Sequence, residues 1–86
     1  MESYELFIKP STAKELEAVG RKSDRTRIVD KIYTLKDDPR PPGCEKLTGQ
    51  DRYRLRQGQF RILYVVDDTE RVVTVVKIGH RRDVYR

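Results

Sequence analysis

The 86-residue sequence predicts a single α+β domain over residues 1–86, with an N-terminal strand, a two-helix hairpin and then an antiparallel three-strand meander. Two observations carry this prediction. Apolar residues recur at helical spacing in the first half, whereas from Arg52 the hydrophobic period changes to two. A chain of this length buries only roughly 60% of its unfolded surface, so we expect a small core under the helices and a functional site on an open face.

The first half begins with a short strand over residues 4–8, which must end before Pro10. Thr12 and Glu15 have the spacing of a capping box, which predicts a short helix that stops at Gly20. Its apolar stripe would consist of Ala13, Leu16 and Val19. The aromatic residues of the first half are assigned to the core, namely Tyr4, Phe7 and Tyr33.

A second helix is predicted after Ser23 or Asp24, either of which can cap its first turn. Its apolar positions follow helical spacing and comprise Ile28, Ile32 and Leu35. The proline-rich stretch 37–43 ends this helix and begins an irregular connection through Gly49.

Three strands are predicted in the second half, over Arg52–Gln57, Phe60–Val66 and Arg71–Ile78. A two-residue turn with Gly58 first pairs Gln57 with Phe60 and therefore Arg56 with Arg61. This register gathers an apolar set on the face under the helices, consisting of Tyr53, Leu55, Phe60, Ile62 and Tyr64.

The opposite face of the hairpin carries Arg54, Arg56 and Arg61. Eight of the twelve arginines lie between residues 52 and 86, and the formal net charge of +5 arises entirely there. Like charges directly opposite one another destabilise a sheet, so an uninterrupted arginine face indicates an anion-binding site. Guanidinium groups match phosphate oxygens, which favours a nucleic-acid partner. If this interpretation holds, Arg61 lies on the polar face and contributes no area to the core. The alternative is that the arginines only interact with solvent and bind no partner.

The single cysteine, Cys44, excludes an internal disulfide and a cysteine-based zinc site. We expect neither a metal nor a cofactor. No segment has the pattern of a signal peptide, and no apolar run approaches the ~20 residues that span a bilayer. These features lead us to expect a cytoplasmic protein without a membrane partner.

Several segments, in this order, resemble the RelE branch of the RelE/ParE toxin family. They are Lys46-Leu47-Thr48-Gly49, Tyr53-Arg54-Leu55-Arg56, Phe60-Arg61-Ile62-Leu63-Tyr64 and Gly79-His80-Arg81-Arg82-Asp83-Val84-Tyr85. The resemblance covers the whole chain. It implies a fold like that of small microbial ribonucleases, and a ribosome-dependent toxin that cuts messenger RNA in the A site without a metal.

The resemblance also implies roles and partners. Arg61 and Arg81 match catalytic arginines, and Tyr85 matches a tyrosine that stacks on or orients a nucleotide. The RNA-binding positions are Arg54, Arg56 and Arg82. Implied partners are the ribosome, its messenger RNA and a RelB-like antitoxin, through which the toxin–antitoxin complex would bind operator DNA.

The identity of the general base stays open. Arg54 and Arg56 stand where the best-known RelE has lysines, and arginine stabilises a phosphorane well but removes a proton poorly. His80 is the alternative, because its unperturbed pKa of about 6.5 suits proton transfer. A histidine beside arginines can equally be an exposed polar residue without a catalytic role.

Two other functions remain open at this point. A ParE-like toxin would share the fold and inhibit DNA gyrase without cutting RNA. A basic module that binds RNA without cleaving it would keep the arginines but would need neither His80 nor Tyr85. The combination of Arg61, Arg81 and Tyr85 favours the nuclease.

Overall fold

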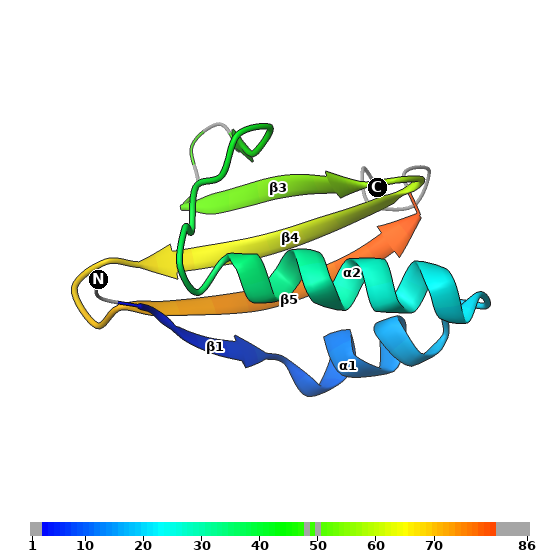
Figure 1. Cartoon of the computed structure of the whole chain (residues 1–86). Coiled ribbons are helices and arrows are strands. Elements are labelled where there is room, and N and C mark those ends of the chain that lie inside the picture. Colours follow the sequence, from blue (N-terminus) through cyan, green and yellow to red (C-terminus); the bar gives the residue numbers. More distant parts are fainter. Residues whose placement is uncertain (1–2, 48, 50, 81–86) are drawn as a thin grey trace.

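The computed structural model describes residues 3–47, 49 and 51–80 as one mixed sheet with two helices (Figure 1). The strand order is β1-β5-β4-β3-β2, in which β1 is parallel to β5 and all other neighbours are antiparallel. The strands are β1 (Glu5–Ile8), β2 (Glu45–Lys46), β3 (Arg52–Gln57), β4 (Phe60–Asp67) and β5 (Val72–His80). The helices are α1 (Pro10–Glu17) and α2 (Lys22–Thr34). The predicted α+β fold and its meander are confirmed, whereas the connection expected to be irregular contains β2.

Neither helix begins with the predicted side-chain cap. Helix α1 starts at Pro10 after Lys9, and α2 starts at Lys22 after Arg21, in both cases without a side-chain cap hydrogen bond. Proline has its φ fixed near the helical value, so it can open a helix without a capping side chain. Thr12 therefore lies inside α1, where it is fully buried, and the capping-box prediction is wrong.

Glu15 instead binds the sheet. Strand β1 pairs with β5 only as far as Ile8 and Val75, so β5 continues beyond its parallel neighbour. The Glu15 carboxylate accepts a 3.1 Å hydrogen bond from the Ile78 backbone N–H and forms a 3.0 Å ion pair with the Lys77 ammonium. A side chain of α1 thus satisfies a backbone donor that a longer β1 would have satisfied.

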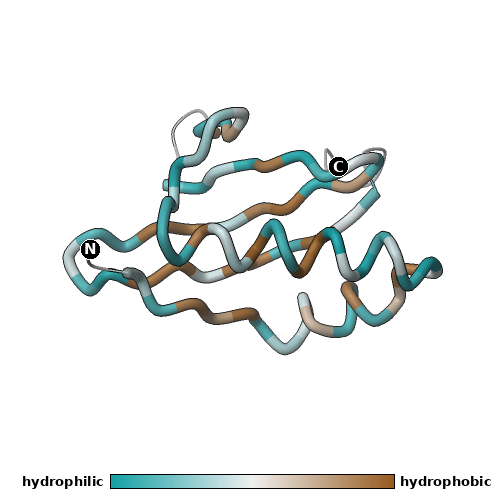
Figure 2. Tube along the Cα trace, viewed as in Figure 1, coloured by the Kyte–Doolittle hydropathy of each residue, from teal (hydrophilic) through white to brown (hydrophobic). Residues whose placement is uncertain are grey.

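The core lies between the sheet and α2, which runs across one sheet face (Figure 1), and the hydrophobic segments of the strands lie beneath it (Figure 2). The fully buried side chains include Ile28, Ile32, Leu35, Ile62, Tyr64, Val73 and Val75. Two aromatic residues assigned to the core are exposed, Phe7 by 54% and Tyr33 by 59%. Phe7 pairs with Thr74, on the face away from the helices, and Tyr33 follows the buried Ile32 on α2, so both predictions are wrong.

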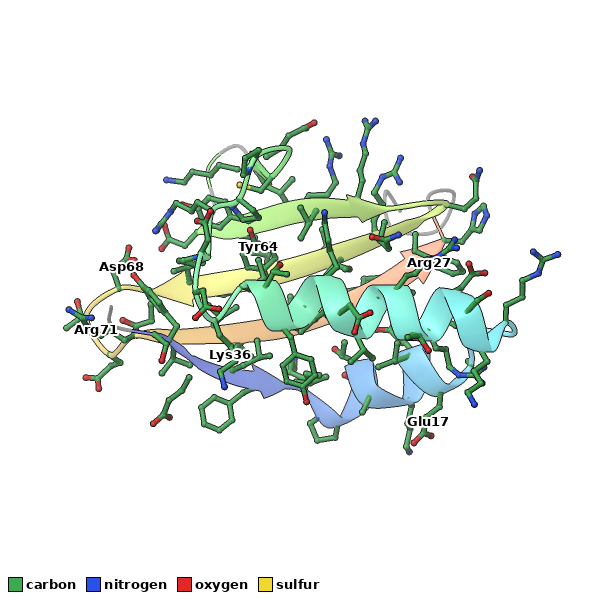
Figure 3. The ribbon with its side chains drawn as sticks, in the orientation of Figure 1. Glu17, Arg27, Lys36, Tyr64, Asp68 and Arg71 are labelled. Carbon is green, nitrogen blue, oxygen red and sulfur yellow. The ribbon has the colours of Figure 1, made fainter. Side chains whose placement is uncertain are left out.

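A polar network fastens the proline-rich connection to the end of the sheet where β4 turns into β5. The Arg40 guanidinium donates to both carboxylate oxygens of Asp68, at 3.1 and 2.7 Å, and to the Tyr53 hydroxyl at 2.9 Å. The Tyr4 hydroxyl also donates to Asp68, at 2.7 Å. Figure 3 shows Asp68 at this turn and Tyr64 on β4, and the Tyr64 hydroxyl donates to the Pro39 carbonyl at 2.8 Å.

These contacts shift ionisation in the network. The hydrogen bonds from Arg40 and Tyr4 lower the pKa of Asp68 from 3.8 to about 2. The bond to Asp68 raises the pKa of the Tyr4 hydroxyl, and burial raises the pKa of Tyr64.

Neither described helix is long and apolar enough to cross a membrane.

We expect Asp68→Asn to lower the melting temperature at neutral pH, because the ionised carboxylate holds Arg40. Since folding lowers the pKa of Asp68, its contribution is present above the ordinary pKa and is lost as the pH falls toward about 2. The difference in melting temperature between wild type and variant should therefore shrink between pH 4 and pH 2. Asp30→Asn, which removes an exposed charge on α2, is the control. A difference that stays constant with pH would contradict the ion pair.

Candidate functional site

A two-residue turn sets the register of the two strands that carry Arg54, Arg56 and Arg61. Gly58 adopts a φ of +60°, which glycine takes without strain, and it joins β3 to β4 with Gln57 opposite Phe60. The pairs Arg56 with Arg61 and Leu55 with Ile62 follow. The predicted register is confirmed, and with it the apolar face under the helices.

Arg54, Arg56 and Arg61 share the opposite face of the sheet, which we call the arginine face. Arg56 is exposed, whereas only 7% of Arg61 is exposed. Arg61 is not a member of the hydrophobic core, as expected, but it is buried on the arginine face and not exposed to solvent. Its guanidinium donates to the Phe60 carbonyl at 3.2 Å, while its buried Nε has no hydrogen-bond partner within the described residues.

Glu45 is a member of this site that the sequence did not reveal. It pairs with Arg54 across β2 and β3, and its carboxylate accepts a hydrogen bond and ion pair from the Arg54 guanidinium. The two residues of β2 are too few to show a period, so pattern reasoning placed Glu45 in a loop. The acid partly neutralises one end of the arginine face and leaves Arg56 and Arg61 at the other.

His80 lies on the face away from Arg61. It pairs with Phe60, and the two rings meet edge to face with centroids 5.9 Å apart, whereas Arg61 pairs with Gly79. A β-bulge causes this placement, because the β4–β5 register shifts between Leu63 and Tyr64. Simple alternation along β5 would have put His80 on the arginine face.

The remaining predicted site residues, Arg81, Arg82 and Tyr85, lie outside the described residues, and their roles stay predictions. Within the described ranges, no group of three or more His, Cys, Asp and Glu side chains could hold a metal ion. The arginine face offers positive charge. Two arginines on directly opposed positions, one of them a buried residue, can bind a phosphate and stabilise negative charge that develops on it.

Comparison with known proteins places this chain in one class, the toxins of type II toxin–antitoxin systems. The family described as ParE toxin of type II toxin-antitoxin system, parDE, matches residues 6–85. The toxin RelE1 of Methanocaldococcus jannaschii is 35% identical over 68 residues, which cover 74% of this chain and 76% of RelE1.

Solved structures agree with this class. An arginine-to-alanine double variant of Escherichia coli toxin RelE in the free state superposes with a TM-score of 0.76 and 30% identity, over 96% of this chain and 90% of that one. The archaeal RelE–RelB complex from Pyrococcus horikoshii gives a TM-score of 0.80 and 26% identity, over 96% and 99% of the two chains. The chain therefore belongs to the RelE/ParE family of type II toxin–antitoxin toxins.

We expect Arg61→Met to raise the free energy of unfolding by about 1 kcal/mol, because methionine keeps much of the buried stem and removes a poorly satisfied charge opposite Arg56. Arg56→Met, at the exposed partner, relieves the same repulsion without relieving a buried charge and should have a smaller effect. Denaturant unfolding of both variants measures this. A destabilised Arg61→Met would show that the guanidinium is a structural group.

Proposed function

We propose that this toxin is a metal-independent endoribonuclease that cleaves messenger RNA in the ribosomal A site. The observation that carries the proposal is Arg61, a residue that is buried to more than nine-tenths and pairs with Arg56 across the two strands, and whose Nε has no hydrogen-bond partner within the described residues. Such an arrangement costs stability and gains a counterion only when an anion arrives. A phosphate of the RNA backbone can be that anion. The similarity to RelE toxins supports messenger RNA on the ribosome as the substrate.

In this reaction the 2′-oxygen attacks the adjacent phosphorus, a pentavalent phosphorane forms, and the bond to the 5′-oxygen breaks. The 2′-hydroxyl loses a proton, and the departing 5′-oxygen gains one. Arg61 stabilises the negative charge of the phosphorane, since a fixed and desolvated donor is most effective where charge develops. Arg81 assists it, and Tyr85 orients the nucleotide.

Binding of the RNA backbone falls to Arg54, Arg56 and Arg82. Arg54 must exchange its contact with Glu45 for a phosphate or share itself between the two, so Glu45 weakens non-specific binding at this edge. His80 stands on the helix side against Phe60, which argues against direct proton transfer at a phosphate held by Arg61. We therefore assign the two proton transfers to groups outside the described arginine face. Groups of the ribosome-bound substrate are among the candidates.

Neutralisation by an antitoxin completes the proposed system. Several of the similar solved structures are RelE–RelB complexes, which makes a RelB-like antitoxin the expected partner. An acidic segment lying across the arginine face would block RNA and would associate more slowly at high salt. Operator DNA would be bound by the resulting complex through the antitoxin.

We expect Arg61→Met to slow cleavage of a ribosome-bound message by roughly 10²–10³-fold, the usual loss when one preorganised donor is removed from a transition state. His80→Gln should stay within a few-fold of wild type, because His80 faces the helices, and Tyr85→Ala should be severely slowed. Single-turnover cleavage with each variant, together with binding of the variant to the ribosome, measures this.

His80→Gln serves as a matched control, since it changes a residue on the same sheet end but on the other face. A loss of about 10²-fold or more in His80→Gln with intact ribosome binding would return the proton-transfer role to this residue. Wild-type cleavage by a folded Arg61→Met would remove the arginine face from the active site.

One observation favours a second function. The family that matches residues 6–85 is described by its ParE member, and a ParE-like toxin would inhibit DNA gyrase without cutting RNA. The two functions separate cleanly in vitro. Inhibition of gyrase supercoiling by the purified chain, with ribosome-bound messages left intact, would support the gyrase toxin, whereas cut messages with unimpaired supercoiling would support the nuclease.

A further inference from the structure

Strand β1 forms an exposed apolar edge of the sheet. It is the end strand of the order β1-β5-β4-β3-β2, and the other end strand, β2, is only two residues long (Figure 1). The exposed large hydrophobic side chains of the described residues are Phe7, Ile8 and Tyr33. All three residues border the hollow between β1 and α2, although the Phe7 side chain points to the other face of the sheet. Proteins normally shield an edge of this kind, because its unpaired backbone groups are a template for another strand.

Hydrogen bonds show which backbone groups of β1 face outward. The N–H groups of Glu5 and Lys9 donate to β5 and its preceding turn, at 2.8 and 3.1 Å, so the alternate residues Leu6 and Ile8 direct their N–H and C=O groups away from the sheet. Tyr4 also faces outward, but its N–H donates to the Lys36 carbonyl at 2.8 Å. Lys36 lies at the end of the hollow nearest the β4–β5 turn (Figure 3).

We propose that this edge binds β1 of a second copy of the chain, antiparallel and centred on Phe7. In that register Leu6 of each copy lies opposite Ile8 of the other, and the two outward residues exchange both backbone hydrogen bonds. Phe7 faces its own counterpart across the two-fold axis as a non-hydrogen-bonded pair, in which side chains approach most closely.

The charges at the ends of β1 fit the same register. Glu5 of one copy lies opposite Lys9 of the other, twice by symmetry. Both side chains are exposed, and neither forms an ion pair within the part of the chain that the structure describes. The segment Glu5-Leu6-Phe7-Ile8-Lys9 is therefore complementary to itself in charge and in apolar character.

Neighbouring registers lack these pairs. A ladder centred on Leu6 would need the N–H of Tyr4, which Lys36 already binds, and would set Glu5 against Phe7. A ladder centred on Ile8 would need an N–H from Pro10, which proline does not have. The backbone alone thus selects Phe7 as the centre.

The dimer keeps both candidate sites accessible. The arginine face lies on β3 and β4, at the other side of the sheet from β1, and a two-fold axis perpendicular to the sheet turns both arginine faces to the same side. Two copies would present one broad basic surface. An interface built on a short edge strand is small, so we expect a dissociation constant in roughly the micromolar range.

Charge reversal tests the register. By sedimentation equilibrium of the full chain purified without a partner, wild type should form dimers, and Glu5→Lys or Lys9→Glu should each weaken them by roughly tenfold or more, because one substitution changes two symmetry-related pairs. The double variant Glu5→Lys/Lys9→Glu should recover dimers, and the two single variants should form a mixed dimer when combined. Glu17→Lys, an equal change of charge on α1, is the control.

Amide hydrogen exchange provides a readout that does not depend on substitution. Exchange at Leu6 and Ile8 should slow as the concentration of wild type rises, while exchange at Tyr4 should not change. A wild-type chain that stays monomeric, a double variant without recovery, or single variants that dimerise like wild type would each overturn the proposal. Charge-reversal variants that bind the antitoxin more weakly but show no change in self-association would assign this edge to the antitoxin and not to a second copy.

Discussion

The two-residue turn at Gly58 is the constraint on which the other features depend. It fixes which residues of β3 and β4 face each other, and side chains in a strand alternate between faces, so a slip of one residue would exchange core and surface. With the observed register, Leu55 and Ile62 pack under the helices while Arg56 and Arg61 face away. Core and candidate site are therefore two consequences of one turn, and neither can be moved without the other.

Two arginines of this chain differ in environment, and the difference separates a structural group from the group that we propose to bind phosphate. Arg40 donates to both oxygens of Asp68 and to the Tyr53 hydroxyl, and its guanidinium lies over the Tyr53 ring. These contacts attach the proline-rich connection to the sheet. Arg61 is more buried, faces Arg56 and leaves its Nε without a partner within the described residues. A buried charge without a counterion among the described residues is typical of a site that binds an anionic ligand.

Sequence reasoning succeeded where one local rule decides and failed where distant parts meet. The turn chemistry of Gly58 and the alternation of β3 suffice for the hairpin register. The side-chain caps failed because Pro10 opens α1 by itself and Glu15 has a better partner on β5. The face of His80 depends on a β-bulge between distant strands, for which the valine-rich β5 shows no local signal.

We propose that the arginine face cuts messenger RNA on the ribosome. Mapping the 5′ ends of a defined message in translating cells, before and after induction of the toxin, tests it most directly. A ribosome-dependent nuclease should produce new ends at a constant position within successive codons, only while the message is being translated. Messages that stay intact during growth arrest, or cuts that ignore the reading frame and persist when translation is blocked, would contradict it.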